Sequence, residues 1–401
     1  MINRYFIEQF KVFFGLEPTD GQKKAIEKLG QFLLSDPKKE AFILKGYAGT
    51  GKTSLVGALV RLLDSIQQKV ILIAPTGRAA KVFSQHAGHT AYTIHKKIYR
   101  QKAFNGEGGN YSLSDNLHQH TLFIVDEASM IANEGLSGGT FGTGRLLDDL
   151  VEYVYAGHGC RLLLIGDTAQ LPPIGEEESP ALAAHVIAGY GLNVEECELK
   201  EVVRQLDSSG ILWNATSLRQ LISDNAYGVF PHMKVTGFPD ICNLPGEELI
   251  EALEQSYSHA ELDDTMVICR SNKRAIIYNN GIRARILYRE EELGSGDMIM
   301  VAKNNYFWAK DYKEIEFIAN GDIAIVRRVR RERELYGFRF ADVTMSFPDY
   351  DDFELEATVL LDTLLSEAPA LTYEQSEKLF NNIMEDYADI PQKRERLKKL
   401  K

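Results

Sequence analysis

Short, largely apolar runs recur along the first half of the chain, each followed by a polar turn and then by apolar residues at helical spacing. The runs cover residues 41–44, 69–74, 121–125 and 160–167. Runs of this length and composition are typical of parallel strands that are buried on both faces. The pattern therefore predicts an α/β fold with a doubly wound parallel sheet. In such folds the ligand binds at the carboxyl edge of the strands.

Two amphipathic segments precede these runs. Residues 1–18 mix charged and apolar side chains, which indicates an amphipathic helix. Thr19 or Asp20 is then placed to cap a second helix. The apolar side of that helix would be formed by Ala25, Ile26, Leu29, Phe32 and Leu33.

The periodic pattern is interrupted at one place and changes at another. Residues 100–119 are polar and contain several glycines, which predicts a hairpin or small inserted element outside the core. Near residue 195 we expect a domain boundary. Beyond it, an apolar run at 265–270 and a helical pattern reaching residue 286 predict a second strand–helix system within residues 196–300.

A third kind of pattern occupies residues 301–401. Short runs at 298–301, 323–329 and 338–345 predict a small β-rich insertion, which a C-terminal helical tail follows. The second of these runs continues into a cluster of arginines. Such a cluster is usually a solvated strand face, although it could also contact a nucleic-acid backbone. Its members are Arg327, Arg328, Arg330, Arg331 and Arg333.

A glycine-rich turn joins the run at 41–44 to the helical pattern after it. Residues 46–53, GYAGTGKT, fit G-x-x-x-x-G-K-[ST] in the required order of strand, turn and helix. The glycines let backbone N–H groups approach phosphate oxygens, and the positive end of the helix faces the same anion. A chance βα turn is the alternative reading. We predict a nucleoside-triphosphate site formed by Gly46, Ala48, Gly49, Thr50, Gly51, Lys52, Thr53 and Ser54.

Within this turn, Lys52 is placed to meet the β- and γ-phosphates, and the Thr53 hydroxyl is placed to hold Mg²⁺. A second segment complements it, because the run at 121–125 ends in Asp126 and Glu127. Beside a phosphate-binding turn, Asp126 would hold Mg²⁺ and Glu127 would orient the attacking water. Strand alternation would start the two carboxylates on opposite faces. An isolated Asp-Glu pair would be only a charged strand end.

Further polar residues follow other strands. Gln170 lies in the turn GDTAQLPP, where it could read the γ-phosphate or be a plain loop amide. Thr76 and Arg78 lie in the turn PTGRAA, which could hold a nucleic-acid phosphate or be an ordinary βα loop. His95 follows a basic, aromatic segment and by itself is more often structural. Gln22, taken alone, is a solvated glutamine in the first turn of a helix.

Composition adds limits to this picture. The chain has 401 residues and a net charge of −12, which argues weakly against a nucleic-acid partner because binding depends on a local basic groove. It has four widely spaced cysteines, with neither a C-x-x-C pair nor a disulfide framework, so a cytoplasmic location fits best. No stretch of about eighteen apolar residues is present, and we expect no membrane-spanning segment. We expect a monomer.

The ordered set of segments resembles the superfamily-one DNA helicases of the RecD and Dda kind. The matching pieces are residues 19–22 and the segments GYAGTGKTS, APTGRAA, TIHK, VDEAS, GDTAQLPPI, LKEVVRQ, ICRSNKRAIIYNNGIR and FIANGDI. They span roughly residues 15–330. The first motif is common to many NTPases, but DEAS followed by GDxxQLPP is specific. The resemblance implies two RecA-like motor domains, an inserted pin at 100–119 and an SH3-like insertion after residue 300.

Several roles are implied by this resemblance. Gln22 would recognise adenine, Lys52 and Thr53 would bind phosphate and Mg²⁺, and Asp126 and Glu127 would be the metal-binding and water-activating pair. Gln170 would link the γ-phosphate to DNA, and Arg204 would reach the γ-phosphate. Contacts to single-stranded DNA would fall to Pro75, Thr76, Arg78, His95 and Asn272. ATP and Mg²⁺ are the implied cofactors.

The sequence departs from the family pattern after the β-rich insertion. The family there carries a T-x-H-K-x-Q-G segment and a later segment that bears an arginine, and neither occurs before Lys401. We therefore expect the second motor domain to be incomplete in this chain. Three functions stay open at this point. The first is an ATP-dependent DNA helicase or translocase, with a 5′-to-3′ polarity implied by the resemblance alone. The second is a nucleotide-gated DNA-binding protein without unwinding, and the third is a P-loop ATPase with a non-nucleic-acid partner.

Overall fold

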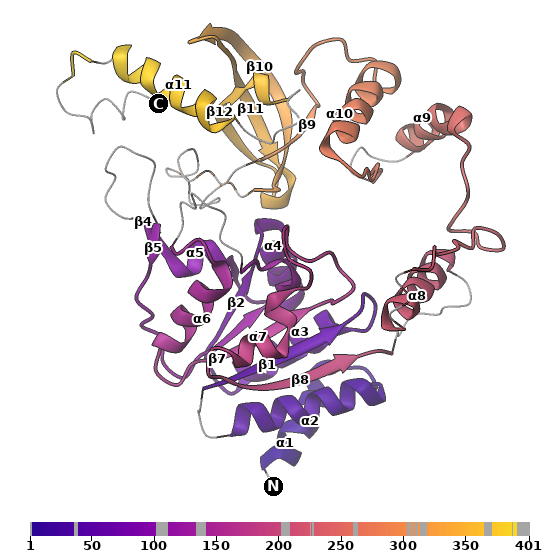
Figure 1. The fold of residues 1–401 in the computed structure, drawn as a ribbon, viewed down its shortest axis with the longest axis vertical. Helices are drawn as coiled ribbons and strands as arrows, with labels where there is room; N and C mark the ends of the chain where they lie inside the picture. Colours follow the sequence, from indigo (N-terminus) through magenta and orange to yellow (C-terminus); the bar gives the residue numbers. More distant parts are fainter. Residues whose placement is uncertain are drawn as a thin grey trace. The chain divides into compact units, whose positions relative to one another are not determined.

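The chain folds into two compact units, Met1–Ile241 and Cys242–Lys401, in the computed structural model (Figure 1). The structure describes residues 2–35, 39–101, 111–133, 142–201, 209–224, 226, 228–259, 264–302, 305, 308, 312, 318, 320–364, 371–386 and 388–390. The first unit ends well beyond the boundary expected near residue 195. Strand β8 (Asn193–Leu199) explains part of this difference, because it pairs with the edge of the first sheet.

A six-stranded parallel sheet forms the centre of the first unit, in the order β3-β2-β6-β7-β1-β8. All four predicted runs are strands of this sheet, which confirms the α/β fold. Their bounds are β1 Glu40–Gly46, β2 Val70–Ala74, β6 Leu122–Val125 and β7 Arg161–Gly166, and the outer strand β3 is Ala91–Thr93.

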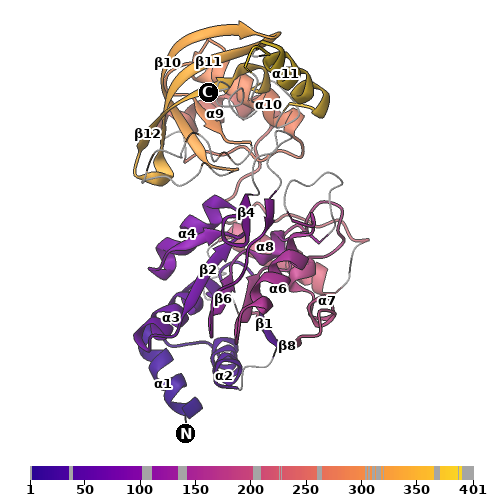
Figure 2. The ribbon, with the colours of Figure 1, turned by 90° about the vertical axis from the view of Figure 1, so that its left-hand side faces the viewer.

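Helices cover both faces of this sheet (Figure 2). One face packs against α1 (Ile2–Phe14), α2 (Asp20–Leu34), α3 (Lys52–Ser65) and α4 (Gly77–Ala87). The other packs against α5 (Ile94–Ile98), α6 (Leu146–Ala156) and α7 (Ala184–Ala188). Along β1 the side chains alternate between the two cores: Phe42 and Leu44 join the first, and Ala41 and Ile43 the second. This two-sided burial accounts for the apolar runs of the sequence.

Among the described residues of the first unit, two further strands and one further α-helix lie outside this sheet. Strands β4 (Tyr99–Gln101) and β5 (Tyr111–Leu113) pair antiparallel in the region where the hairpin or small inserted element at 100–119 is expected. Residues 102–110 of that element lie outside the described part of the chain. Helix α8 (Gly210–Ser223) follows β8.

The second unit contains a four-stranded antiparallel sheet in the order β12-β11-β10-β9. The predicted runs form β9 (Met298–Met300), β10 (Ile323–Leu335) and β11 (Phe338–Phe347), whereas β12 (Phe353–Leu360) was not predicted. The β-rich insertion is thereby confirmed. The described helices of the second unit are α9 (Leu249–His259), α10 (Asn272–Gly281) and α11 (Tyr373–Asp386). A π-helical turn, Ile282–Ile286, extends α10. The tail at 392–401 lies outside the described residues.

The prediction of a strand at 265–270 is wrong. These residues form no strand, and Met266 and Ile268 are 75% and 89% exposed. A strand needs hydrogen bonds from a neighbouring strand, and none of the described residues pairs with this segment. The apolar run therefore predicted a buried strand, but no described strand pairs with this segment.

The arginine cluster lies on β10, and all of its members except the half-buried Arg333 are exposed. Arg330 pairs with Glu356 on the neighbouring part of the sheet, and Arg333 pairs with Asp342 at 3.1 Å. Arg327 lies 3.6 Å from Asp352. Acidic residues of the same sheet thus offset much of the positive charge that the sequence displays as a run.

Candidate nucleotide site

The glycine-rich turn connects the end of β1 to the start of α3. Gly49 and Gly51 have φ angles of 82° and 83°, in the left-handed region that glycine adopts without strain. A Cβ atom on Gly46 would lie 2.8 Å from Thr50 Oγ1, so the turn leaves no space for a side chain there. The first turn of α3 has no side-chain cap, and its N–H groups are therefore available to an anion.

Lys52 lies across the mouth of this turn. Its Nζ donates to the carbonyl oxygens of Gly46 and Tyr47, the latter at 3.0 Å. Burial lowers the pKa of Lys52, while the carboxylates of Asp167, Glu127 and Asp126 act to raise it. The lysine is thus a cation held near three acidic side chains, a setting in which phosphate and metal can be bound together.

Asp126 and Glu127 follow β6 in a tight turn. The Glu127 N–H donates to Asp126 Oδ1 at 3.0 Å, and Glu127 has a φ of 52°. Strand β6 ends at Val125, so both carboxylates lie in the turn after the strand rather than on the strand itself. Burial raises the pKa of Asp126 to about 6, which marks a carboxylate that is largely withdrawn from water.

Gln170 and Asp167 lie in the turn after β7. The exposed Gln170 accepts a hydrogen bond from Ser129 Oγ at 2.8 Å, which links this turn to the segment after Glu127. Asp167 is 6% exposed and accepts from the Ala48 N–H at 3.0 Å and the Ala169 N–H at 2.8 Å. We did not single out Asp167 from the sequence. Its position directly after a buried strand, like that of Asp126, was the available signal.

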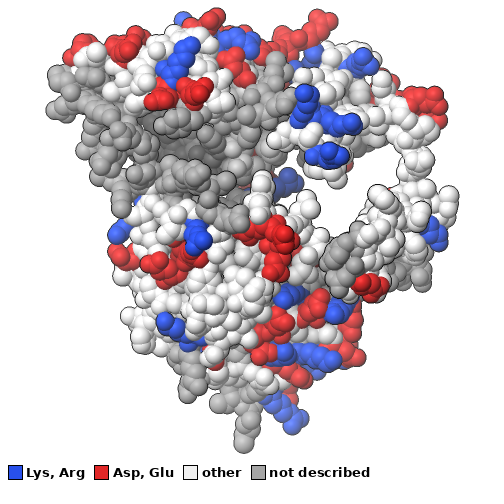
Figure 3. Space-filling model, viewed as in Figure 1, with Lys and Arg blue, Asp and Glu red and all other residues white. Residues whose placement is uncertain are grey.

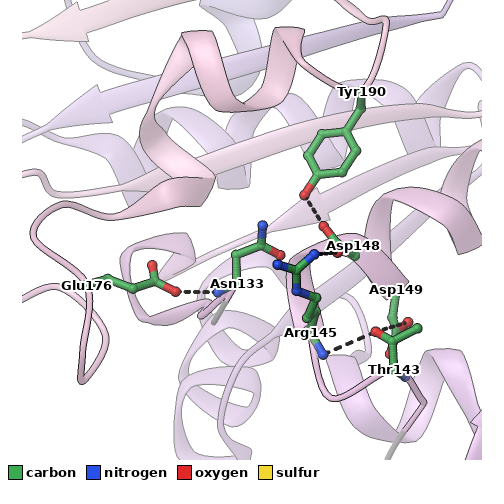
Figure 4. A network of polar contacts seen from close by, with 7 residues as sticks. All are labelled: Asn133, Thr143, Arg145, Asp148, Asp149, Glu176 and Tyr190. Atoms are coloured by element: carbon green, nitrogen blue, oxygen red, sulfur yellow. Dashed lines mark hydrogen bonds and ion pairs between the residues drawn. The ribbon is translucent and has the colours of Figure 1, made fainter. Parts of the chain in front are cut away.

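A polar network lies among the segments that follow β6 and β7 (Figure 4). The Asn133 N–H, beyond Glu127 in the chain, donates to Glu176 beyond the Gln170 turn at 2.5 Å. On α6, Asp148 accepts from the Tyr190 hydroxyl and Asp149 from Thr143 Oγ1 at 2.9 Å. The Asn133–Glu176 and Tyr190–Asp148 bonds connect the segments that follow β6 and β7, in addition to the Ser129–Gln170 contact.

Gln22 is buried beneath the glycine-rich turn, with 3% of its surface exposed. Its Nε2 donates to the Thr50 carbonyl at 3.0 Å, and its Oε1 accepts from the Thr19 N–H in a capping box. The reading of Gln22 as a solvated first-turn glutamine is therefore wrong, because its amide supports the turn. Its role toward adenine stays a prediction.

Arg219 on α8 also reaches this turn, and no sequence pattern indicated it. Its Nη2 lies 3.5 Å from the Ala48 carbonyl oxygen, and its guanidinium lies 4.9 Å from the centre of the Tyr47 ring. An arginine in the middle of a helix gives no local sign of the partner that the fold provides. Arg204, the arginine implied by resemblance, lies outside the described residues.

The residues proposed to contact DNA fall in both units. Pro75 and Thr76 follow β2, and Thr76 Oγ1 caps α4 by accepting from the Ala79 N–H at 3.2 Å. Arg78 is exposed. Burial lowers the pKa of His95, whose ring lies 5.7 Å from that of Tyr99. These residues lie near the carboxyl ends of β2 and β3. Asn272 is the first residue of α10 in the second unit.

The oxygen donors at the start of α3 and after β6 suit an Mg²⁺ ion that is also bound by phosphates, rather than a metal ion held by protein side chains alone. Thr53 and Ser54 are exposed at the start of α3, and Asp126 supplies a carboxylate. Within the described part of the chain, no group of three or more His, Cys, Asp or Glu residues could hold a metal ion. Mg²⁺ is commonly held by one or two protein oxygens together with substrate phosphates, which fits this set.

Among the residues that the structure describes, no helix is long and apolar enough to cross a bilayer.

Comparisons with known proteins agree with these features. A family model described as an AAA domain matches residues 17–226. The ATP-dependent RecD2 DNA helicase of Deinococcus radiodurans is 33% identical over 132 residues, which are 33% of this chain and 16% of that protein. The ATP-dependent DNA helicase dda of Enterobacteria phage T4 is 25% identical over 323 residues, covering 78% of this chain and 68% of that protein.

Among solved structures, the Pif1 helicase of Candida albicans is 17% identical and covers 86% of this chain and 78% of its own, with a TM-score of 0.34. That score is too low to support an argument about arrangement. The family match covers more than half of the chain and includes the glycine-rich turn, Asp126, Glu127 and Gln170. The chain therefore belongs to the AAA-domain family of P-loop proteins, and the RecD- and Dda-like helicases that its motifs resemble are among its relatives.

Proposed function

We propose that this chain is an ATP-dependent motor of the superfamily-one kind, a DNA helicase or translocase on single-stranded DNA. One observation carries the proposal. Lys52, Asp126, Glu127 and the Ser129–Gln170 pair are all presented after strands of one parallel sheet, beside a glycine-rich turn. The RecD2 and Dda relatives are named as ATP-dependent DNA helicases, and they supply the DNA part of the proposal.

The residues divide the reaction between them. Lys52 and the N–H groups of the turn would bind the phosphates, and Thr53 and Asp126 would hold Mg²⁺, which neutralises phosphate charge when bound. Glu127 would orient the attacking water. Gln22 would contact the adenine, and Arg204 would approach the γ-phosphate. Gln170, tied to Ser129, would sense that phosphate and pass its state toward Pro75, Thr76, Arg78, His95 and Asn272 on DNA.

ATP hydrolysis at low salt, with and without single-stranded DNA, tests this function. We expect strong stimulation by DNA, since phosphate contacts are strongest at low salt. Lys52→Ala should abolish turnover and weaken ATP binding, whereas Glu127→Gln should abolish turnover and retain ATP binding. A duplex with a 5′ or a 3′ single-stranded tail then tests the 5′-to-3′ polarity, which rests on resemblance alone.

Two other outcomes would point to other functions. DNA binding that changes with nucleotide but shows negligible turnover would indicate a nucleotide-gated DNA-binding protein. Turnover without any affinity for DNA at low salt would indicate a P-loop ATPase with another partner. The net charge of −12 is the observation that favours this last reading.

A further inference from the structure

The contact between α8 and the glycine-rich turn brings a second cation to the phosphate site. The Arg219 guanidinium lies 4.9 Å from the centre of the Tyr47 ring, and its Nη2 is 3.5 Å from the Ala48 carbonyl oxygen. The turn and α8 are more than 150 positions apart in sequence. Arg219 therefore reaches the turn through the fold.

One nitrogen of this guanidinium lacks an acceptor. Arg219 Nη1 is buried and has no hydrogen-bond partner among the residues that the structure describes. The other contacts are weak for an arginine: a long hydrogen bond and an aromatic face. Arg219 as a whole is half-buried, so it is this one shielded nitrogen that lacks a partner. Guanidinium donors withdrawn from water normally bind carboxylate or phosphate oxygens in a planar fork. The missing acceptor here points to an anionic ligand.

The position of Lys52 indicates which anion Arg219 would bind and which part of that anion it would contact. Lys52 Nζ donates to the carbonyl oxygens of Gly46 and Tyr47, and Arg219 approaches the next carbonyl, that of Ala48. The lysine of this motif meets the β- and γ-phosphates of a bound nucleotide. Arg219 also acts to lower the pKa of Lys52, which places the two cations close enough to repel each other. A phosphate between them would relieve that repulsion.

We propose that Arg219 binds the terminal phosphate of the nucleotide and so makes the site prefer a triphosphate over a diphosphate. This inference rests on the proposed nucleotide-binding function and adds a residue to it. Tyr47 holds the guanidinium in place by stacking. Arg219 is distinct from Arg204, and neither the sequence motifs nor the resemblance assigned it a role.

Calorimetric titration of the full chain with ADP and with a non-hydrolysable β,γ-imido analogue of ATP tests the proposal, with Mg²⁺ present. We expect Arg219→Ala to weaken binding of the triphosphate by about tenfold or more and to leave ADP binding nearly unchanged. Arg219→Lys should restore part of the loss, because it keeps the charge without the planar fork. Gln220→Ala, the next residue on α8, is the matched control and should bind both nucleotides as the wild type does.

Each other result has a separate meaning. Equal binding of the triphosphate by wild type and Arg219→Ala would overturn the role of Arg219 while leaving the nucleotide site intact. An equal loss for both nucleotides in Arg219→Ala and Arg219→Lys would overturn it too, because it would make Arg219 only a structural link. A wild-type chain that binds neither nucleotide would instead refute the proposed function itself.

Discussion

Three aspartates at the ends of strands or turns show how residue environment decides a carboxylate's role. Burial raises the pKa of Asp126 to about 6. Asp167 is also buried, and its carboxylate accepts hydrogen bonds from two backbone N–H groups. Asp297 is buried as well; burial alone would raise its pKa, but hydrogen bonds from Arg283, Gly294 and Arg289 outweigh that effect and hold it low. Asp126 has a single such donor, the Glu127 N–H, which does not offset burial, so this carboxylate is costly to keep charged; it is also the proposed metal ligand.

The Asp126→Asn variant should be more stable than the wild type at neutral pH in metal-free, nucleotide-free buffer. The pKa of Asp126 is raised from 3.8 to about 6, so the folded state keeps a proton that the unfolded state loses. This group's contribution therefore falls as pH rises through that window, by at most about 3 kcal/mol. Urea unfolding at pH 4.5 and 7.5 measures it. A variant-minus-wild-type difference that does not grow with pH would contradict the prediction.

Asp167→Ala should destabilise the first unit by about 1–3 kcal/mol, because it leaves the Ala48 and Ala169 N–H groups without their acceptor. Asp167→Asn keeps one acceptor oxygen and should cost less. The free energy of unfolding in urea separates the two variants. Equal stabilities of Asp167→Ala and the wild type would show that water replaces the carboxylate at both N–H groups.

At the scale of elements, helix α6 joins the hairpin base to the sheet. Asp149 on α6 is 1% exposed and accepts from the Tyr99 hydroxyl at 2.6 Å and from the Thr143 N–H at 3.1 Å. Tyr99 is the first residue of β4, so a single carboxylate fixes the start of the hairpin expected to act as a pin. Such a buried charge is stabilising only while its donors are kept.

Tyr99→Phe should lower the free energy of unfolding by about 1–2 kcal/mol, since Asp149 loses one donor and keeps those of Thr143. Tyr5→Phe changes a tyrosine that is 62% exposed and serves as the control, with no expected change. Thermal and urea unfolding measure both. If the two variants behaved alike, the Tyr99–Asp149 contact would not contribute to stability.

At the scale of the whole molecule, the chain is two units, and each has its own core. On the face shown in Figure 3, basic and acidic side chains are interspersed, and basic ones gather near α10. Arg270, Lys273 and Arg274 are exposed there, and so is Asn272. A net charge of −12 is thus compatible with a local basic surface, which is what a nucleic-acid partner requires.

Asp297→Asn should destabilise the second unit and leave the first unchanged. Asp297 accepts from Arg283 at 2.8 Å and from Arg289 at 2.5 Å, and an asparagine cannot balance two partly buried guanidinium groups. A loss of about 3–5 kcal/mol is expected. Because the folded-state pKa of Asp297 is lowered from 3.8, the wild-type advantage is fully present at neutral pH and is lost progressively as pH falls below 3.8 and through the lower folded-state pKa.

The two tryptophans of the chain allow this to be measured unit by unit. Trp213 lies on α8 in the first unit and Trp308 in the second. Trp213→Phe and Trp308→Phe backgrounds therefore report the unfolding of one unit each by fluorescence. A shift of the Trp213 transition in Asp297→Asn would show that the units do not unfold independently.

Local chemistry in the sequence was sufficient for much of this protein. The runs at 41–44, 69–74, 121–125 and 160–167 predicted the strands because burial on both faces leaves a signal in every residue. The P-loop could also be predicted from the sequence, because its requirements are local. Gly49 and Gly51 adopt positive φ angles and Lys52 is placed to bind phosphate, all within the eight residues 46–53. The order of Asp126, Glu127 and Gln170 after strands followed from the same reasoning.

Tertiary structure alone decided what depends on partners far along the chain. Gln22 is buried because Thr50 lies above it, Asp167 is held by Ala48, and Arg219 meets Tyr47, and none of these partners is a sequence neighbour. Likewise, 265–270 has the composition of a strand, but a strand requires a neighbour to pair with. Hydrogen bonds and burial between distant segments are properties of the fold, so no local pattern could predict them.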